Sequence, residues 1–153
     1  MVETNGRNFD LLTLGQVLLR LSPPDNERLS RGDTFVKQVG GAELNVAVGA
    51  ALLGLHTGVI SKLPAHDIGS FMKGKIRSFG VSDDFFMYDQ SPAARVGIYY
   101  YENGAYPRKP KVIYDRNHSS FFSLDIDEIP EEVYTASKCF HTTGITLALN
   151  EDI

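Results

Sequence analysis

The amino-acid sequence predicts an α/β protein with a parallel sheet flanked by helices and a small antiparallel β insertion. From 9 to 80, short apolar runs alternate with segments of helical periodicity, which is the order in which a parallel sheet acquires its crossover helices. The pattern changes at 94–116, where two alternating runs flank a loop, as the strands of a hairpin do. With 153 residues, of which 42% are hydrophobic, the chain can bury a core.

Strands are expected where short apolar runs end at glycine or polar residues. The run "FDLLTLG" at 9–15 and the run "TGVISKL" at 57–63 are typical of buried strands. The run "TFVKQV" at 34–39 alternates, which predicts a strand exposed on one face. A helix at 130–137 and a strand "CFHTTGI" at 139–145 follow later. The chain ends soon afterwards without a helix to cover that strand, so we expect the C-terminal half of the fold to be missing from it.

Two helices are predicted between these strands. The first contains Leu44, with Gly54 as its left-handed C-terminal cap. Its apolar stripe consists of Leu44, Val48, Ala51, Leu52 and Leu55. The second is capped by Asp67 and closed by Gly80. Its apolar stripe consists of Ile68, Met72, Ile76 and Phe79.

The insertion is predicted to be an antiparallel pair formed by 94–104 and 111–116. Alternation places Val96, Ile98 and Tyr100 on one face of the first strand. We expect this apolar face to meet either a second chain or the body of the domain.

Composition and charge restrict the class of protein. A net charge of -4 and a pI near 5.5 provide no basic field, so nucleic acid and anionic membranes are not expected partners. The single Cys139 cannot form an internal disulfide, and we expect a small buried side chain in a reducing compartment. Residues 1–10 lack the apolar core of a signal peptide, and no apolar run reaches membrane-spanning length. We therefore expect a cytoplasmic protein.

The stretch "VGGAELNVAVGAALLG" at 39–54 is the candidate binding element. Neither a Rossmann nor a Walker glycine pattern occurs in the sequence. Gly40 and Gly41 permit close approach of a ligand to a helix start, and the Asn45 amide suits a sugar hydroxyl. Alternatively, the glycines form a turn and Asn45 caps or solvates the helix. The residues alone leave both interpretations open.

The segment "GGAELNVAVGAALLGLHTGVISKLPAHDIG" at 40–69 resembles the first signature of the ribokinase and phosphofructokinase-B family of sugar kinases. The similarity extends over essentially the whole chain. The motifs "LLRLSPP", "GIYYYENG" and "KVIYDRNHSS" are most similar to those of the 2-keto-3-deoxygluconate kinases. The resemblance implies a ribokinase-like fold in which 1–153 is the N-terminal portion of one domain. It also implies a β lid, with its strands within about 16–39 and 94–116.

The resemblance also implies a set of residues that contact the substrate. They are Gly40, Gly41 and Asn45 for the sugar hydroxyls, and Tyr99, Tyr114 and Arg116 for the keto acid. Residues 114 and 116 share a strand face, and an arginine can hold a carboxylate through a planar pair of N–H donors. The alternative is a solvated arginine on an exposed sheet, with the tyrosines serving strand packing. At Gln16 the chain departs from the acidic residue that many family members carry, so an amide would replace a carboxylate contact to a hydroxyl.

The activity that the resemblance implies is phosphorylation of 2-keto-3-deoxygluconate with ATP and Mg²⁺. The second family signature, Gly-Ala-Gly-Asp, does not occur in this sequence. We therefore expect no catalytic, cofactor-binding or metal-binding residue here, and no activity from the chain alone. The histidines show no metal-ligand spacing. The lid is expected to form a homo-oligomer. The alternatives are a kinase for fructose, ribose or a nucleoside, and a non-catalytic sugar-binding or dimerising module.

Overall fold

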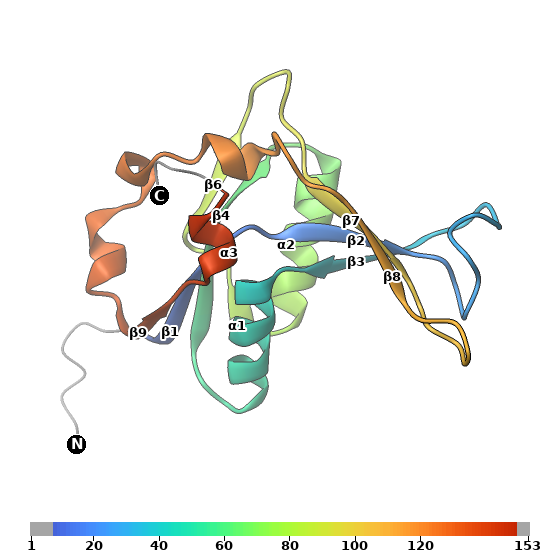
Figure 1. Ribbon diagram of the computed structural model, residues 1–153. Helices are drawn as coiled ribbons and strands as arrows, with labels where there is room; N and C mark the ends of the chain where they lie inside the picture. Colours follow the sequence, from blue (N-terminus) through green and yellow to red (C-terminus); the bar gives the residue numbers. More distant parts are fainter. Residues whose placement is uncertain (1–7, 150–153) are drawn as a thin grey trace.

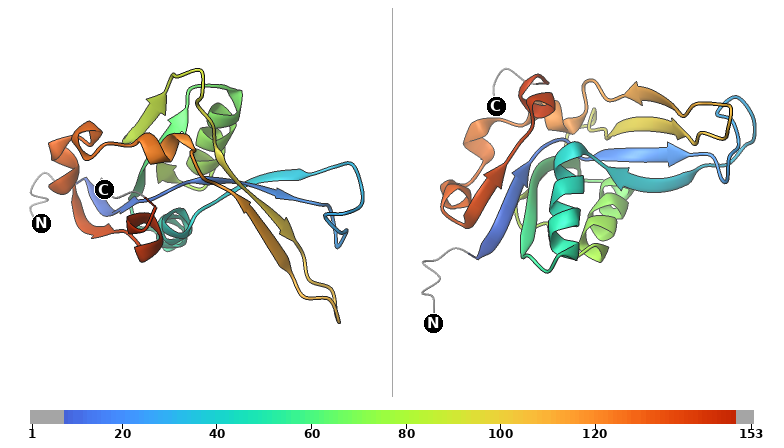
Figure 2. Two further views of the ribbon diagram at one scale, coloured as in Figure 1. Left: turned by 45° about the horizontal axis from the view of Figure 1, so that its top comes forward. Right: turned by 60° about the horizontal axis from the view of Figure 1, so that its bottom comes forward.

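The computed structural model describes residues 8–149, which form an α/β body from which a second sheet projects (Figures 1 and 2). The expectations for the first seven residues and for 150–153 lie outside the described part. The body contains a five-stranded sheet in the order β5-β4-β1-β9, with β6 also paired to β4, and every pair is parallel. Its strands are β1 Phe9–Leu14, β4 Thr57–Pro64, β5 Val81–Ser82, β6 Phe86–Asp89 and β9 Ser137–His141.

Helices cover one face of this sheet and short 3-10 helices cover the other. The helices α1 Ala42–Leu52 and α2 Asp67–Ser78 share a core with Val59 and Leu63 of β4. On the opposite face, Phe121 packs with Leu12 and Ile60 in a second core. The 3-10 helices are η1 Ser120–Ser123, η2 Ile126–Glu128 and η3 Glu131–Tyr134. The predicted α/β class with a parallel sheet and flanking helices is therefore confirmed. No helix within residues 8–149 is long and apolar enough to cross a membrane.

The first helix ends at the predicted glycine, but only part of its predicted apolar stripe is buried. Gly54 has a φ of 90°, the left-handed conformation expected of the residue that ends a helix. Leu44 is buried with Ala47, whereas Leu52 is 78% exposed and Leu55 is 46% exposed. The predicted stripe was wrong at these last positions, because the face set by Leu44 and Ala47 turns away from the sheet by residue 52 and Leu55 lies beyond the end of the helix.

The second helix is capped by a different residue from the one expected. The Nδ1 atom of His66 accepts a hydrogen bond from the Ile68 backbone N–H at 3.2 Å, so His66 is the cap. Asp67 is instead the first helical residue, where its negative charge favours the helix dipole. Met72 and Ile76 are fully buried, but Phe79, at the end of the predicted stripe, is 41% exposed.

The C-terminal part of the described chain differs from its prediction. The expected helix at 130–137 is only the 3-10 turn η3, and the strand β9 stops at His141. Its continuation is the single turn α3 Gly144–Leu147. Cys139 is exposed, not buried, because β9 is an edge strand of the described sheet.

We call the second, four-stranded sheet the projecting sheet; its order is β3-β2-β7-β8. Its strands are β2 Leu18–Ser22, β3 Val36–Gly40, β7 Gly97–Glu102 and β8 Lys111–Asp115. The pairing of β7 with β8 is antiparallel, as predicted. The pairing of β2 with β7 is parallel, because both strands leave the body from the same edge of the parallel sheet. β3 is exposed over most of its length, not only on one face.

The two faces of the projecting sheet have different surroundings. Val96 is buried and Ile98 is partly buried against the core beneath α1 and α2, so this face meets the body of the domain. Arg20 is in register with Tyr99, and Tyr99 with Tyr114, so these three side chains share the opposite face.

Candidate functional site

A cavity of about 180 Å³ lies where the projecting sheet meets the N-terminus of α1. It adjoins the carboxyl end of β1, the edge of a parallel sheet at which ligands bind in open α/β folds. All the expected site residues except Gly40 line it. The cavity is lined by Gln16, Leu18, Gly41, Ala42, Glu43, Asn45, Tyr99, Tyr114, Arg116 and Ile145.

The two adjacent glycines serve different purposes. Gly41 is the N-cap of α1 with a φ of 144°, and a Cβ there would lie 2.7 Å from the backbone oxygen of Gln16. Gly40 ends β3 and does not line the cavity. A Cβ at Gly40 would lie 2.4 Å from the hydroxyl oxygen of Tyr99. Gly40 therefore makes room for a side chain that does line the cavity.

Asn45 lies on the first turn of α1 and is exposed to the cavity. Its backbone N–H donates to the Gly41 carbonyl at 2.9 Å, which begins the helical ladder. The N-cap is Gly41, with no side-chain capping bond, so Asn45 does not cap the helix. The structure therefore excludes the interpretation that Asn45 caps the helix. The exposed position of its amide is compatible both with solvation and with a contact to a ligand.

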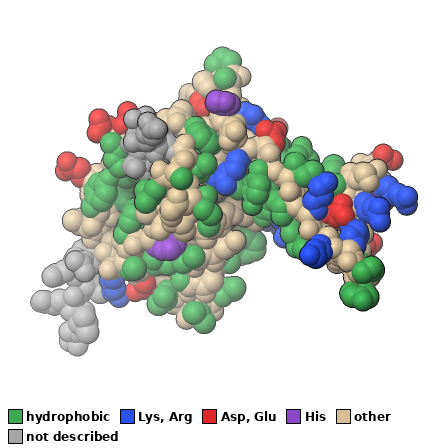
Figure 3. All heavy atoms as spheres, in the orientation of Figure 1, with side chains coloured by type: hydrophobic (Ala, Val, Ile, Leu, Met, Phe, Trp, Pro, Cys, Tyr) green, Lys and Arg blue, Asp and Glu red, His purple; other side chains and the backbone are tan. Residues whose placement is uncertain are grey.

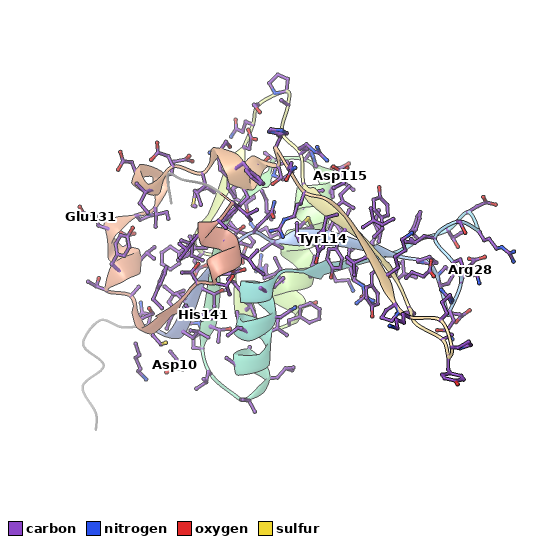
Figure 4. The ribbon with its side chains drawn as sticks, in the orientation of Figure 1. Asp10, Arg28, Tyr114, Asp115, Glu131 and His141 are labelled. Carbon is purple, nitrogen blue, oxygen red and sulfur yellow. The ribbon has the colours of Figure 1, made fainter. Side chains whose placement is uncertain are left out.

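Tyr99, Tyr114 and Arg116 approach the cavity from the projecting sheet. The rings of Tyr99 and Tyr114 are 6.0 Å apart, and the Arg116 guanidinium carbon lies 5.7 Å from the centre of the Tyr114 ring. Figure 4 shows Tyr114 on β8, close to where this strand meets the body. Strand pairing thus brings together residues from two separate motifs, "GIYYYENG" and "KVIYDRNHSS".

The amide of Gln16 is engaged within the protein. Its Nε2 donates to the Arg116 backbone oxygen at 3.2 Å and to Ser119 Oγ at 2.7 Å. Its Oε1 accepts from Arg116 Nε at 2.7 Å. Both N–H donors and the oxygen of the amide therefore have partners within the protein, and a contact between this amide and a substrate hydroxyl stays a prediction.

Burial shifts the pKa of two groups that line the cavity. Loss of solvent lowers the pKa of the Arg116 guanidinium, while Tyr114 and Glu43 act in the opposite direction. An arginine keeps its charge in proteins despite such a shift, so Arg116 supplies positive charge to the cavity. Burial likewise raises the pKa of Tyr99, which keeps its hydroxyl protonated as a hydrogen-bond donor.

Glu43 is a cavity residue that the sequence analysis did not single out. Its side chain is 3% exposed, and its Oε1 accepts from the Thr143 backbone N–H at 3.2 Å and from the Thr143 hydroxyl at 2.5 Å. The Thr146 hydroxyl donates to the same oxygen at 2.6 Å. Glu43 therefore fixes the segment after β9 against the start of α1. Its place between the glycines and Asn45 was the only local signal.

Two aspartates that do not line the cavity have partners elsewhere. Asp115 pairs with Arg95 at 2.8 Å, and Asp125 caps η2. No group of three or more histidine, cysteine, aspartate or glutamate side chains within 8–149 is placed to hold a metal ion.

Comparison with known proteins identifies the class. Residues 8–153 match the model of the pfkB family of carbohydrate kinases, and the chain belongs to this family. It is 37% identical over 144 residues to 2-dehydro-3-deoxygalactonokinase of Haloferax volcanii, covering 94% of this chain and 44% of that protein. It is 30% identical to 5-dehydro-2-deoxygluconokinase 1 of Bacillus cereus, covering 97% of this chain and 44% of that protein.

Solved structures agree with the observed fold. The crystal structure of 2-dehydro-3-deoxygluconokinase from Thermotoga maritima superposes with a TM-score of 0.87 at 38% identity. The match covers 93% of this chain and 43% of that one. The fold is therefore ribokinase-like, as expected, and the chain spans less than half the length of the relatives that it matches.

Proposed function

We propose that this chain supplies the acceptor site of a kinase that phosphorylates 2-keto-3-deoxygluconate. The observation that carries the proposal is the half-buried Arg116, which lines the cavity with Tyr99, Tyr114 and Asn45. Within residues 8–149, no hydrogen bond or ion pair engages the two Nη groups of Arg116. A guanidinium with two free parallel donors suits the carboxylate of a sugar acid.

The names of the relatives support the same substrate class. Each denotes a kinase for a deoxy keto sugar acid, although the acids differ in the positions of the keto group or in stereochemistry. In the proposed complex, Arg116 binds the carboxylate, the tyrosine hydroxyls bind oxygens nearby, and Asn45 binds a sugar hydroxyl close to the glycines. The projecting sheet acts as a lid over the acceptor.

The remainder of the reaction is assigned to sequence outside this chain. The kinase would use ATP with Mg²⁺ to supply and neutralise the transferred phosphoryl group. Residues 1–153 contain no Gly-Ala-Gly-Asp motif, so the catalytic base is assigned elsewhere and the chain alone should show no ATP-dependent turnover. Purified residues 1–153 can be assayed directly with ATP and the sugar acid.

We also propose that the enzyme is cytoplasmic and that it forms a homo-oligomer through the lid.

The test substitutes Arg116 in the full-length protein. Arg116→Ala should raise KM and lower kcat/KM for the sugar acid by about 30-fold to 1,000-fold, or about 2–4 kcal/mol, because a charged hydrogen bond is lost and the carboxylate is left unpaired. Arg116→Lys should restore only part of this, since an ammonium lacks the planar fork.

A neutral analogue that lacks the carboxylate provides the control substrate. It should be a poor substrate of the unchanged enzyme and nearly insensitive to either substitution. Equal losses for the acid and the neutral analogue would show that Arg116 supports the sheet and not the substrate. That outcome would favour the alternative acceptors, namely fructose, ribose or a nucleoside.

A further inference from the structure

We propose that Gln16 is a positioning residue that holds Arg116 in its carboxylate-binding orientation without neutralising its charge, and that it thereby sets the preference for an acid over a neutral acceptor. This inference rests on the proposed function, because it concerns the same cavity. It adds a role for a residue whose amide was expected to contact the substrate itself.

The hydrogen bonds of Gln16 fix which way its amide faces. Its side chain is 2% exposed and is held by Arg116 at two points, the backbone oxygen and Nε, and by Ser119 Oγ. Rotating the amide by half a turn would place its NH₂ against the Nε–H donor and its oxygen against the Arg116 carbonyl. The observed orientation is therefore the one that satisfies every group.

Packing around Gln16 restricts the amide further. A Cβ added at Gly97 would lie 2.9 Å from Gln16 Nε2 and 3.4 Å from the Arg116 Cα. The glycine at 97 thus leaves only enough space for the amide between β7 and the start of the loop after β8. Gln16 follows β1, so it ties the projecting sheet to the body at the cavity wall.

One bond at Nε determines the direction of the whole guanidinium. The group is planar, so a fixed Nε leaves the two Nη atoms as the remaining donors in a set plane. The amide carries no charge, and within residues 8–149 no carboxylate forms an ion pair with Arg116; the Oε1 atom of the nearby Glu43 accepts from Thr143 and Thr146. The positive charge of Arg116 therefore stays available for an anionic ligand.

A glutamate at position 16 would bind Arg116 through a negative charge, which the amide of Gln16 does not carry. Its carboxylate would form an ion pair with Arg116 and compete with the carboxylate of the substrate. It would also place an acceptor against the Arg116 carbonyl and leave Ser119 without its amide donor. The neutral amide is thus the side chain that both orients the guanidinium and leaves its charge free.

The experiment compares Gln16→Glu with Gln90→Glu in the full-length protein. Gln90 is exposed in the loop after β6, so Gln90→Glu adds the same charge away from the cavity. KM and kcat are measured for the sugar acid and for a neutral analogue. We expect Gln16→Glu to raise KM for the acid by about tenfold or more, with little change in kcat and little change for the neutral analogue. Gln90→Glu should change neither.

Ser119→Ala provides a second variant in case Gln16→Glu does not fold. It removes one partner of the amide and leaves Arg116 and the net charge intact, so it should raise KM for the acid by a few-fold. An unchanged acid-to-neutral ratio in both variants, or equal losses on both substrates, would overturn the positioning role.

Failure of this inference can be told apart from failure of the proposed function. If Arg116→Ala removes the preference for the acid but Gln16→Glu and Ser119→Ala leave it intact, the carboxylate site stands and the role of Gln16 is wrong. If the unchanged enzyme shows no preference for the acid, the proposed substrate class itself is wrong.

Discussion

At the scale of single residues, the two glycines that open α1 illustrate how similar residues can have different physical requirements. Position 41 requires glycine because its backbone φ of 144° is rarely adopted by L-residues. Position 40 requires glycine because the Tyr99 hydroxyl occupies the space that a side chain at this position would need. The first requirement concerns folding, and the second concerns the cavity.

This difference predicts opposite results for two substitutions. In the full-length protein, Gly40→Ala should displace the Tyr99 hydroxyl and raise KM for the proposed sugar-acid substrate, with little loss of stability, because a tyrosine tip can move. Gly41→Ala should lower the free energy of unfolding by about 1–3 kcal/mol, because strained backbone meets the Gln16 carbonyl. Urea denaturation and steady-state kinetics measure the two effects.

Gly49→Ala is the matched control on the same helix. A Cβ at Gly49 would have no atom within 4 Å, and the residue lies inside α1. This substitution should therefore stabilise the protein by about 0.5–1 kcal/mol through helix propensity. A similar loss of stability in all three alanine variants would contradict the division of roles.

At the scale of elements, side-chain carboxylates join segments that the backbone ladders do not connect. Glu43 joins α1 to the segment that follows β9. Asp89, at the end of β6, accepts from the Ser91 backbone N–H at 2.9 Å and from the Ser120 hydroxyl at 2.8 Å. It therefore links the parallel sheet to η1 on the opposite face from α1 and α2.

The link at Asp89 predicts a pH dependence of stability. The Ser91 hydrogen bond, together with that of Ser120, lowers the pKa of Asp89 below its ordinary value. A lowered folded-state pKa stabilises the protein above the unfolded value of about 3.9, and this contribution is lost as pH falls through the folded value. Asp89→Asn should therefore flatten the decline of stability below about pH 4.

Urea denaturation between neutral pH and about pH 3 measures this decline. Asp84→Asn serves as the control, because Asp84 is exposed and lies in the same region of the chain. An identical acid decline in the unchanged protein and in Asp89→Asn would show that the carboxylate makes no net contribution.

At the scale of the whole molecule, the parallel sheet is covered on both faces but not along the edge formed by β9. Within the described residues, β9 pairs only with β1. Phe140, Ile145 and Leu147 are each more than 40% exposed in this region. Lysine and arginine side chains, by contrast, gather on the projecting sheet in the view of Figure 3. The two ends of the molecule thus present chemically different surfaces.

Because β9 forms an open edge of the described sheet, we expect the Cys139 thiol to react readily in the native chain. A water-soluble maleimide should label the 153-residue chain under native conditions at a rate comparable to that in urea, because the thiol is exposed. The readout is unambiguous, since the sequence contains one cysteine, and Cys139→Ser gives the background. Native protection by about 100-fold or more would show that this edge is covered in solution.

The sequence by itself determined the type and order of most elements and the family. Apolar periodicity and glycine positions located β1, β4, α1, α2 and the β7–β8 pair, because these signals act over a few neighbouring residues. The same local signals were wrong for the end of the described chain. The exposure of Cys139 and the short η3 depend on what packs against them, which periodicity does not encode.

The candidate site was predicted in part for the same reason. The motifs indicated Asn45, Tyr99 and Arg116, because each lies in a short recognisable segment. Only the tertiary structure decided that Gln16 accepts a hydrogen bond from Arg116 and that Glu43 accepts one from Thr143. Each of these pairs is separated by 100 residues along the chain. A hydrogen bond needs its two atoms within about 3 Å in a defined orientation, and only the assembled sheets bring such distant residues to that distance.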